Sequence, residues 1–381
     1  MTIDGPPRVA LLGVHGFGKV HLDGLLRLAG TGAVRVAGLA DPRPPAPESL
    51  ELVRALPGDV PVLADAATLL EQVRPDITIV STPIHTHLPL ARLALAAGSH
   101  LLLEKPPTAS MAQFRELSAE VAAAGRLCQV GFQSFGSHAL AHAARLVADG
   151  ALGPLRGIGV HGAWVRDRTY FARAAWAGRM ALDDVPVTDG ALTNAFAHAT
   201  ASALRVAGVP DDADVTVELE RYRVVSPEGE DTATARLTAG GVPIVVAVTL
   251  CAAEQRAPMI VVHGEHGRLE LEYTTDTLTG RTADGAKVGA PPGRAVLLDN
   301  LVAHLADPAT PLLAPLAACG PFMHLLEAVR RDGPARPLPT AAVTEIDGRP
   351  VVRGADEIVR RCAEELALFS DLPAPWLTAA A

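Results

Sequence analysis

The first 130 residues alternate short apolar stretches with amphipathic ones, and this alternation constrains the fold more than any other feature of the sequence. The apolar runs lie at 9–12, 34–40, 60–63, 77–81, 101–103 and 126–132. They predict six short strands, and the segments between them have the spacing of amphipathic helices. Strands that alternate with helices form a parallel sheet covered on both faces. We therefore expect residues 1–130 to be a doubly wound α/β Rossmann domain.

The pattern changes after about residue 150, where longer apolar stretches follow one another across short glycine-containing turns. Such turns are typical of antiparallel neighbours. The predicted strands are 155–165, 215–225, 232–239, 242–251, 258–263 and 267–273, and the predicted helices are 189–207, 297–306, 314–331 and 354–369. Residues 131–381 are therefore predicted to form an α+β domain with an open, mainly antiparallel sheet.

Composition excludes several classes of function. The formal net charge of -9 repels nucleic-acid backbones and anionic lipid, and the 14 aromatic residues offer few platforms for stacked bases. The most apolar stretch is interrupted before it could span a bilayer, and no secretory signal pattern is present at the start. The four cysteines have no zinc-binding spacing. These features predict a cytoplasmic protein without a metal, a nucleic-acid partner or a membrane partner.

A glycine cluster joins the first predicted strand to the first predicted helix, where backbone N–H groups and the helix dipole can hold a pyrophosphate. Its residues are Gly13, Val14, His15, Gly16, Phe17 and Gly18. Gly13 and Gly18 match the G-x-G-x-x-G spacing, but His15 stands in place of the middle glycine and Gly16 follows it. The cluster indicates dinucleotide binding.

Asp41 ends the second predicted strand, where a carboxylate can accept hydrogen bonds from an adenosine ribose. This position favours NAD. Arg43 lies close by and could instead pair with the 2'-phosphate of NADP, which leaves NADP as the second candidate. A structural role for Asp41, as a turn former before Pro42, is the alternative.

Two further positions predict catalytic chemistry. Lys105 follows a predicted strand, and it is one of only three lysines among 33 basic residues, which suggests that an amine is needed there. Asn194 and His198 are four residues apart on a predicted helix, with Asp189 as its plausible N-cap. The alternatives are a chance surface lysine and a histidine that packs in the interior.

Several polar and aromatic residues of the second predicted domain suit the recognition of a polyol, which needs planar polar groups and an apolar platform. They are Gln133, His161, Trp164, Arg166, Tyr170, Trp176 and Arg179. Ordinary packing and surface roles remain the alternative for each of them.

Together these motifs resemble the glucose-fructose oxidoreductase and inositol dehydrogenase family, known as Gfo/Idh/MocA. The resemblance runs from Arg8 to about Trp376. The stretches that carry it are Val9–Gly13 with Gly18, Ala40–Pro42, Val80–Pro83 with His87, Ala97–Gly98, Glu104–Pro106, Val130–Phe132, Gly150–Gly153, Trp176, His198 and Gly264–Gly267.

The resemblance implies an NAD(P)-dependent oxidoreductase that transfers hydride between nicotinamide and a hydroxyl or ketone of a sugar, amino sugar or cyclitol. It implies that Lys105 hydrogen-bonds the reacting hydroxyl and that His198 exchanges its proton. It also adds Ser81, Thr82, Pro83, His87 and Glu104 to the cofactor-binding residues. The open sheet of such proteins often forms oligomer interfaces, so a homodimer or homotetramer is expected.

Two departures from the family pattern keep other functions open. Family members usually have aspartate where this chain has Asn194, so either Asp183, Asp184 or Asp189 replaces that charge, or Lys105 carries more of the chemistry, or activity is lost. His15 either crowds the pyrophosphate or donates a hydrogen bond to it. A redox-neutral sugar-processing enzyme with tightly bound NAD and an inactive dinucleotide-binding regulator are the alternative functions.

Overall fold

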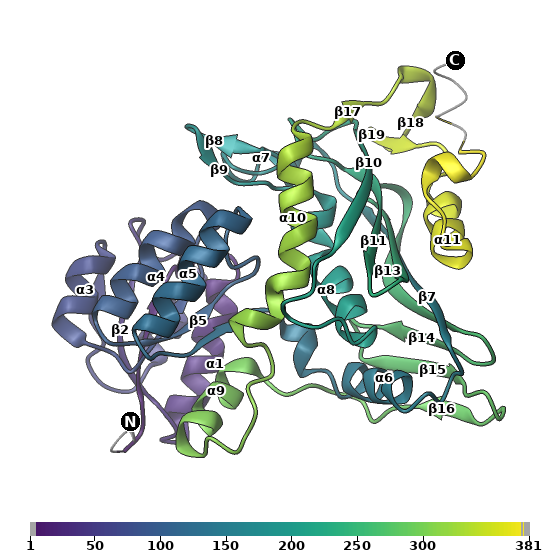
Figure 1. The fold of residues 1–381 in the computed structure, drawn as a ribbon. Coiled ribbons are helices and arrows are strands. Elements are labelled where there is room, and N and C mark those ends of the chain that lie inside the picture. The colour runs from purple at the N-terminus through teal and green to yellow at the C-terminus, as the bar shows by residue number, and fades with distance from the viewer. Residues whose placement is uncertain (1–4, 375, 377–381) are drawn as a thin grey trace. The chain divides into compact units, whose positions relative to one another are not determined.

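The chain folds into two units, which a computed structural model describes over residues 5–374 and 376. Met1–Phe132 and Ala295–Ala317 make up the first unit, while Gln133–Arg294 and Ala318–Ala381 make up the second. The sequence predicts a single boundary near residue 130 and gives no sign that 295–317 returns to the first unit. Figure 1 shows the elements of both units.

The first unit is built on a six-stranded parallel sheet with strand order β3-β2-β1-β4-β5-β6. Its strands are β1 (Arg8–Leu12), β2 (Arg35–Ala40), β3 (Val62–Leu63), β4 (Ile77–Val80), β5 (His100–Leu103) and β6 (Cys128–Val130). Its α-helices are α1 (Gly18–Gly30), α2 (Pro47–Ala55), α3 (Ala66–Val73), α4 (His87–Ala96), α5 (Met111–Ala123) and α9 (Leu297–Ala306). The predicted doubly wound Rossmann fold is confirmed.

Central strands β1 and β4 consist almost wholly of buried apolar residues, as expected for parallel strands covered on both faces. The strand order reverses between these two neighbours, and doubly wound sheets bind their ligands at such a point, beyond the carboxyl ends of the strands. The loops after β1 and β4 are therefore the first place to look for a cofactor site.

The second unit contains a nine-stranded mixed sheet with strand order β16-β15-β14-β13-β7-β12-β11-β10-β17. Only the β7–β12 and β10–β17 pairs are parallel, which confirms the mainly antiparallel prediction. The strands are β7 (Leu155–Val165), β10 (Thr216–Arg223), β11 (Thr232–Ala239), β12 (Val242–Thr249), β13 (Cys251–Gly264), β14 (Arg268–Glu272), β15 (Thr277–Arg281), β16 (Lys287–Gly289) and β17 (Arg336–Pro337). Two small hairpins add β8 (Ala181–Leu182), β9 (Val185–Pro186), β18 (Val343–Ile346) and β19 (Arg349–Val352).

Helices cover this sheet on both faces (Figure 1). The helices that pack on its strands are α6 (His138–Ala148), α8 (Ala197–Val206), α10 (Gly320–Asp332) and α11 (Ala355–Glu365), and the short helix α7 (Arg168–Ala172) follows β7. Residues of α11 and of the segment after it pack on one face, where Ala163, Val245 and Ala247 share a buried core with Val359, Phe369 and Trp376. This face of the sheet is thus occupied by the chain's own C-terminal segment.

The predicted helix over 189–207 consists of two pieces. A π-helical segment, η3 (Ala191–Ala195), precedes α8, and Phe196 at the junction has φ -107° and ψ 17°. Asp189 does not act as the predicted N-cap, because Gly190 occupies that position and the Asp189 carboxylate accepts from Gly178 N at 2.6 Å instead.

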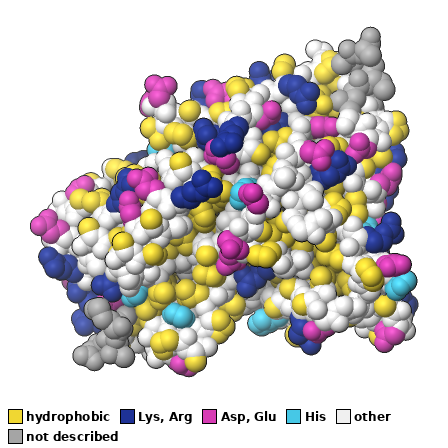
Figure 2. Space-filling view, in the orientation of Figure 1, with side chains coloured by type: hydrophobic (Ala, Val, Ile, Leu, Met, Phe, Trp, Pro, Cys, Tyr) yellow, Lys and Arg dark blue, Asp and Glu magenta, His cyan; other side chains and the backbone are white. Residues whose placement is uncertain are grey.

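No helix of the described chain combines the length and the apolar character needed to cross a bilayer. Basic and acidic side chains are interspersed on the face drawn in Figure 2, with no extended basic patch.

Candidate active site

The glycine turn between β1 and α1 depends on glycine at two positions where the backbone approaches closely. Gly13 has φ +90°, and a Cβ there would lie 2.2 Å from the carbonyl oxygen of Ser81, at the end of β4. A Cβ on Gly18 would lie 2.1 Å from the oxygen of Gly13. Gly13 therefore allows the turn to pack against the end of β4. Gly18 allows the first residue of helix α1 to pack against the backbone of Gly13.

Three backbone amides of this turn point to a ligand. Within the described part of the chain, the N–H groups of His15, Gly16 and Phe17 donate to no protein acceptor. Such amides, at the N-terminal end of the 13-residue helix α1, suit an anionic group. Nε2 of His15 is also buried without a hydrogen-bond partner, and Oδ1 of Asp41 lies 3.9 Å from it. The residues present thus fit the pyrophosphate of a dinucleotide.

Asp41 lies buried at the end of β2, beside this turn. Its Oδ2 accepts a hydrogen bond from Val14 N at 3.0 Å, and its Oδ1 accepts one from Arg43 N at 3.0 Å. The Arg43 side chain is 72% exposed, with Nε 3.8 Å from Oδ1. Asp41 therefore fixes the turn as well as placing a carboxylate where a ribose is read in such folds.

Glu104 and Lys105 follow β5 at the same edge of the sheet, because all six strands are parallel. Oε1 of the buried Glu104 lies 2.9 Å from Nε2 of His21 on α1, and Oε2 accepts from Lys105 N at 3.1 Å. Burial raises the pKa of Glu104, but the hydrogen bond and charge of His21 and the charge of Lys105 outweigh it, so the pKa lies below its usual value. The backbone at Lys105 is thereby tied to helix α1.

The loop after β4 is held to the turn at Lys105 by a buried histidine. His87 Nδ1 lies 3.0 Å from Pro106 O, and its Nε2 lies 2.9 Å from Thr82 O. Burial lowers the pKa of His87. The Thr86 hydroxyl donates a hydrogen bond to the Thr82 hydroxyl at 2.7 Å, across the η1 turn (Ile84–Thr86), which Pro83 precedes. The resemblance assigned His87 to the cofactor site. In the structure, both of its ring nitrogens contact backbone carbonyl oxygens of this loop and of the turn at Lys105.

In the second unit, η3 and α8 carry Asn194 and His198. The Asn194 side-chain amide donates to Oδ1 of Asp189 at 2.7 Å. Asp183 and Asp184 instead lie exposed on the β8–β9 turn, both with positive φ. Of the three aspartates considered from the sequence, Asp189 is therefore the one that the structure places against Asn194.

The His198 ring lies beside Ser134, in the η2 turn Gln133–Gly136, and beside Tyr273. Nδ1 of His198 is 3.4 Å from Oγ of Ser134, which in turn accepts from Oγ of Ser202 at 2.9 Å. The Tyr273 ring stacks at a centroid distance of 6.2 Å, and burial raises the pKa of its hydroxyl. These contacts orient the imidazole from two sides.

Five side chains at the end of β7 and after it form what we call the arginine–aromatic cluster: Trp164, Arg166, Tyr170, Arg173 and Trp176. The Arg166 guanidinium lies 4.9 Å from the Trp164 ring centroid and 5.3 Å from that of Tyr170. The Arg173 guanidinium lies 3.8 Å from the Tyr170 ring and 5.0 Å from the Trp176 ring. The cluster contacts residues on either side of η3. The ring centroids of Trp164 and Phe196 are 4.4 Å apart, and Nη2 of Arg173 lies 3.8 Å from Oδ2 of Asp189.

Three of the predicted substrate contacts lie outside this cluster. His161 is three residues before Trp164 on β7, so its side chain projects from the opposite face of the sheet, the face covered by α11. Burial lowers the pKa of His161, and the charge of Glu364 on α11 partly opposes this shift. Arg179 lies 3.5 Å from Glu228 and is largely exposed. Gln133 begins the turn that carries Ser134.

Sequence reasoning missed Ser134, Arg173, Phe196 and Tyr273. A signal existed for Arg173, because it lies three residues after Tyr170 and shares its helical face. Phe196 lies between Asn194 and His198, and Ser134 follows Gln133 directly. Tyr273 is remote in sequence, and no local pattern connects it with His198.

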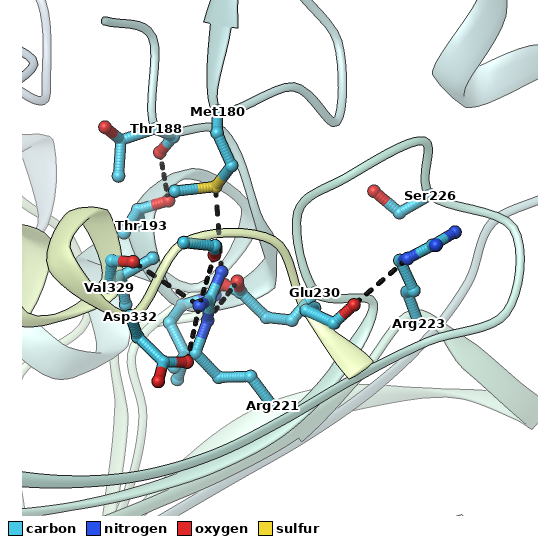
Figure 3. Close-up of polar contacts among 12 residues, drawn as sticks. Met180, Thr188, Thr193, Arg221, Arg223, Ser226, Glu230, Val329 and Asp332 are labelled. Atoms are coloured by element: carbon cyan, nitrogen blue, oxygen red, sulfur yellow. Dashed lines mark hydrogen bonds and ion pairs between the residues drawn. The ribbon is translucent and has the colours of Figure 1, made fainter. Parts of the chain in front are cut away.

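A buried ion pair between Arg221 and Glu230 is connected to η3 by a hydrogen bond (Figure 3). The Arg221 side chain is fully buried and donates from Nε to Glu230 Oε2 at 2.9 Å. Its Nη1 donates to Asp332 Oδ2 at 2.8 Å and to Gly333 O at 2.8 Å. Oε1 of Glu230 then accepts from Leu192 N at 3.0 Å, in the first turn of η3. Arg221 and Glu230 therefore anchor the segment that carries Asn194.

The described residues contain no group of three or more His, Cys, Asp or Glu side chains arranged to hold a metal ion.

The fold and the glycine turn define a nucleotide-binding Rossmann unit joined to a mainly antiparallel sheet unit. Residues 7–132 match the model of the oxidoreductase family with an NAD-binding Rossmann fold, and residues 140–270 match that of the GFO/IDH/MocA C-terminal domain. The chain belongs to the GFO/IDH/MocA family of oxidoreductases.

Two curated proteins are similar in sequence. One is the uncharacterized oxidoreductase YdgJ of Escherichia coli (strain K12), 27% identical over 229 residues, or 60% of this chain and 62% of that protein. The other is inositol 2-dehydrogenase 4 of Saccharopolyspora erythraea, 34% identical over 148 residues, or 38% of this chain and 42% of that protein. The matches span less than two thirds of either relative.

Solved structures share the fold. The WlbA dehydrogenase from Bordetella pertussis in complex with NADH and UDP-GlcNAcA has a TM-score of 0.70 at 20% identity, covering 86% of this chain and 96% of that one. Levoglucosan dehydrogenase in complex with NADH has a TM-score of 0.67 at 16% identity, covering 86% and 96%. Aldose-aldose oxidoreductase from Caulobacter crescentus complexed with glycerol has a TM-score of 0.69 at 19% identity, covering 86% and 97%.

Proposed function

We propose that this chain is an NAD-dependent dehydrogenase or reductase that acts on a hydroxyl or ketone of a sugar, an amino sugar or a cyclitol. One observation carries the proposal: the glycine turn, Asp41 and Lys105 follow β1, β2 and β5 at one edge of the parallel sheet. The relatives support the substrate class, since those described include an inositol dehydrogenase and structures with a nucleotide sugar or acting on sugars.

Asp41 supports NAD over NADP. Its buried carboxylate is held by Val14 N and Arg43 N, and a 2'-phosphate placed beside it would meet a like charge. Arg43 offsets this charge only weakly, because its Nε lies 3.8 Å from Asp41 Oδ1 and its side chain is 72% exposed to water. The buried Nε2 of His15 favours the role of hydrogen-bonding the dinucleotide over that of blocking it.

In the proposed reaction the nicotinamide supplies or accepts the hydride, and the chain handles the proton. Lys105 donates a hydrogen bond to the reacting oxygen, with its backbone held by Glu104. His198 exchanges the hydroxyl proton, with its ring oriented by Ser134 and Tyr273. The Asn194 side chain is neutral, but it is hydrogen-bonded to the Asp189 carboxylate. In this proposal Asp189 supplies the negative charge that an aspartate at position 194 would carry.

The first test is the melting temperature of the purified protein with NAD+, NADH, NADP+ and NADPH in turn. A ligand at about 100 times its Kd stabilises by roughly 2.7 kcal/mol, which gives a shift of a few degrees. We expect the shift with NAD(H) and little with NADP(H). Equal shifts with both pairs would contradict the role given to Asp41. Assay of the denatured protein for nucleotide covers the case in which cofactor is already bound, and stoichiometric retention without net NADH release would indicate the redox-neutral enzyme.

The second test is Lys105→Ala, with Lys287→Ala in an exposed position as the matched control. We expect Lys105→Ala to fold, to bind NADH as the wild type does, and to lose turnover by about 100-fold or more on whichever polyol the wild type oxidises. Lys287→Ala should retain full activity. Unchanged turnover in Lys105→Ala would refute the role of this amine. Absence of turnover by the wild type on all sugars and cyclitols would favour the regulator.

The homodimer or homotetramer expected from the resemblance stays a prediction, as does the cytoplasmic location. Light scattering coupled to size-exclusion chromatography measures the first directly. Since α11 packs on β7, β12 and β13, an interface over these three strands would have to include α11.

A further inference from the structure

The segment that carries the arginine–aromatic cluster is strongly basic in an acidic chain. Residues 164–179 contain four arginines (166, 168, 173 and 179) and one aspartate (167), a net charge of +3, whereas the whole chain has -9. Two of these arginines, Arg166 and Arg173, have their guanidinium groups over aromatic rings. Arg179 lies beside Glu228, and Arg168 is exposed.

These two arginines differ in what balances their charge. Arg173 lies 3.8 Å from the buried carboxylate of Asp189. Arg166 has no carboxylate within ion-pair distance among the described residues. Its Nη1 donates to Val165 O at 2.8 Å and to Gln255 Oε1 at 3.4 Å, while its Nε and Nη2 donate to no described acceptor. Arg166 thus carries a positive charge that this unit does not neutralise.

The rings fix the orientation of this guanidinium. Trp164 and Tyr170 contact it through their π-systems, and this leaves the N–H groups along its edge to hydrogen-bond. A planar guanidinium held in this way matches the two oxygens of a carboxylate or a phosphate. Its side chain is only partly exposed, so such a pair would be screened less than one on the open surface.

The cluster is continuous with the elements that carry His198. Trp164 packs on Phe196, which lies between Asn194 and His198 in the chain. Asn194 is neutral, and the Asp189 carboxylate is already engaged by Gly178 N, by the Asn194 amide and by Arg173. An anion near Arg166 would therefore meet little uncompensated negative charge from these residues.

We infer that the substrate carries a negatively charged group, a carboxylate or a phosphate, and that Arg166 binds it while Trp164 and Tyr170 hold the guanidinium in place. This inference rests on the proposed function and narrows its substrate class to anionic sugar derivatives. Arg166 is then a specificity-determining residue, distinct from the proton-transferring His198.

The test uses the protein saturated with NADH and three probes: D-glucuronate, D-glucose 6-phosphate and neutral D-glucose. Isothermal titration calorimetry should show at least one anionic probe binding about tenfold or more tightly than glucose. Preference for glucuronate would identify a sugar acid, and preference for the phosphate ester would identify a phosphorylated or nucleotide-linked sugar. Added salt should weaken the binding of the anionic probe and leave the binding of glucose unchanged.

Arg166→Gln should remove this preference and leave glucose and NADH binding unchanged, whereas Arg166→Lys should retain part of it. Arg168→Gln, an exposed neighbour, is the matched control and should behave as the wild type. The inference is overturned if neither anionic probe binds more tightly than glucose, or if Arg166→Gln weakens glucose equally while circular dichroism shows an intact fold. A protein that binds no NADH would instead contradict the proposed function.

Discussion

His21 Nε2 lies 2.9 Å from Glu104 Oε1, and this buried contact ties the helix after the glycine turn to the strand end that presents Lys105. The second oxygen of Glu104 accepts from Lys105 N. The helix proposed to hold the dinucleotide and the residue proposed to contact the reacting hydroxyl are thus connected through one carboxylate. Neither His21 nor this connection was identified from the sequence.

Glu104→Gln should destabilise the protein at neutral pH by about 1–3 kcal/mol, because an amide cannot accept both hydrogen bonds through oxygens. The pKa of Glu104 lies below its usual value in the folded state, so its stabilising contribution is present above pH 4.5 and is lost as the pH falls through the folded value. Urea unfolding at neutral and acid pH measures both effects. A variant that loses as much stability on acidification as the wild type would contradict the assignment.

Gly131→Ala should disturb the same carboxylate from the opposite side. A Cβ at Gly131 would lie 2.6 Å from Glu104 Oε1, and the buried Glu104 side chain has little room to withdraw. We expect a loss of about 1–3 kcal/mol, as for other overpacked sites. Gly24→Ala is the matched control, because its Cβ would meet nothing within 4 Å on helix α1, so it should be neutral or slightly stabilising. Similar stabilities for the two variants would refute the steric argument.

His198→Ala should lower kcat by about 100-fold to 10,000-fold and remove the limb near neutrality from the pH profile of kcat/KM. Ser134→Ala removes only the hydroxyl 3.4 Å from Nδ1, so it should have a smaller effect on kcat and retain the limb. Steady-state kinetics across pH with both variants separates the two roles. If the limb persists in His198→Ala, another group is the base.

Arg221→Ala should destabilise the second unit by about 3–5 kcal/mol, because it leaves the buried Glu230 carboxylate without its partner. Replacing both residues together, as Arg221→Met with Glu230→Leu, removes the buried charges and should recover much of this loss. Since Glu230 also accepts from Leu192 N, the double variant should still show reduced kcat. Chemical denaturation and kinetics on both variants test this, and a fully active double variant would refute the anchoring role.

His100 predicts a pH dependence of stability in the first unit. Its Nδ1 accepts from Leu127 N at 3.0 Å, and burial, together with the charge of Arg126, lowers its pKa to about 4. The unfolded chain, with a histidine pKa of about 6.5, binds the proton first, so the free energy of unfolding should fall as the pH drops from about 6.5 toward 4.

His100→Asn keeps an acceptor near the position of Nδ1 but does not titrate. Denaturation curves at about pH 7 and pH 5 should therefore show a smaller loss of stability in this variant than in the wild type. The other buried histidines are unchanged between the two proteins, so the difference isolates His100. Equal losses would show that His100 does not contribute.

Local patterns were sufficient for most of the first unit. Buried parallel strands are short apolar runs, and each of the six appears where the sequence places it to within about two residues. The glycine turn and the strand ends at Asp41 and Lys105 followed from the same pattern. The return of residues 295–317 has no local signal, because it depends on long-range contacts such as Gln129 Nε2 with Leu297 O and Gln129 Oε1 with Ala314 N.

The second half of the candidate site was less predictable. The two-residue alternation of β7 was enough to separate His161 from Trp164, but residue type alone had grouped them. The π-helical turn has no recognised sequence signature, so the sequence predicts one continuous helix with Asp189 as its N-cap. In the structure, the Asp189 carboxylate accepts a hydrogen bond from the Asn194 side chain instead. Helix α6 was not predicted, although Ser137 caps it by accepting from Leu140 N.

The way α11 covers the large sheet also bears on how the chain must be synthesised. The β7 and β12 residues under α11 precede it by more than 100 positions, so their partners Val359, Phe369 and Trp376 leave the ribosome well after them. Until then, the nascent sheet presents an apolar face with nothing to cover it. A premature stop shortly before Ala355 would therefore release a polypeptide that contains almost every residue of the candidate site and yet is prone to aggregate.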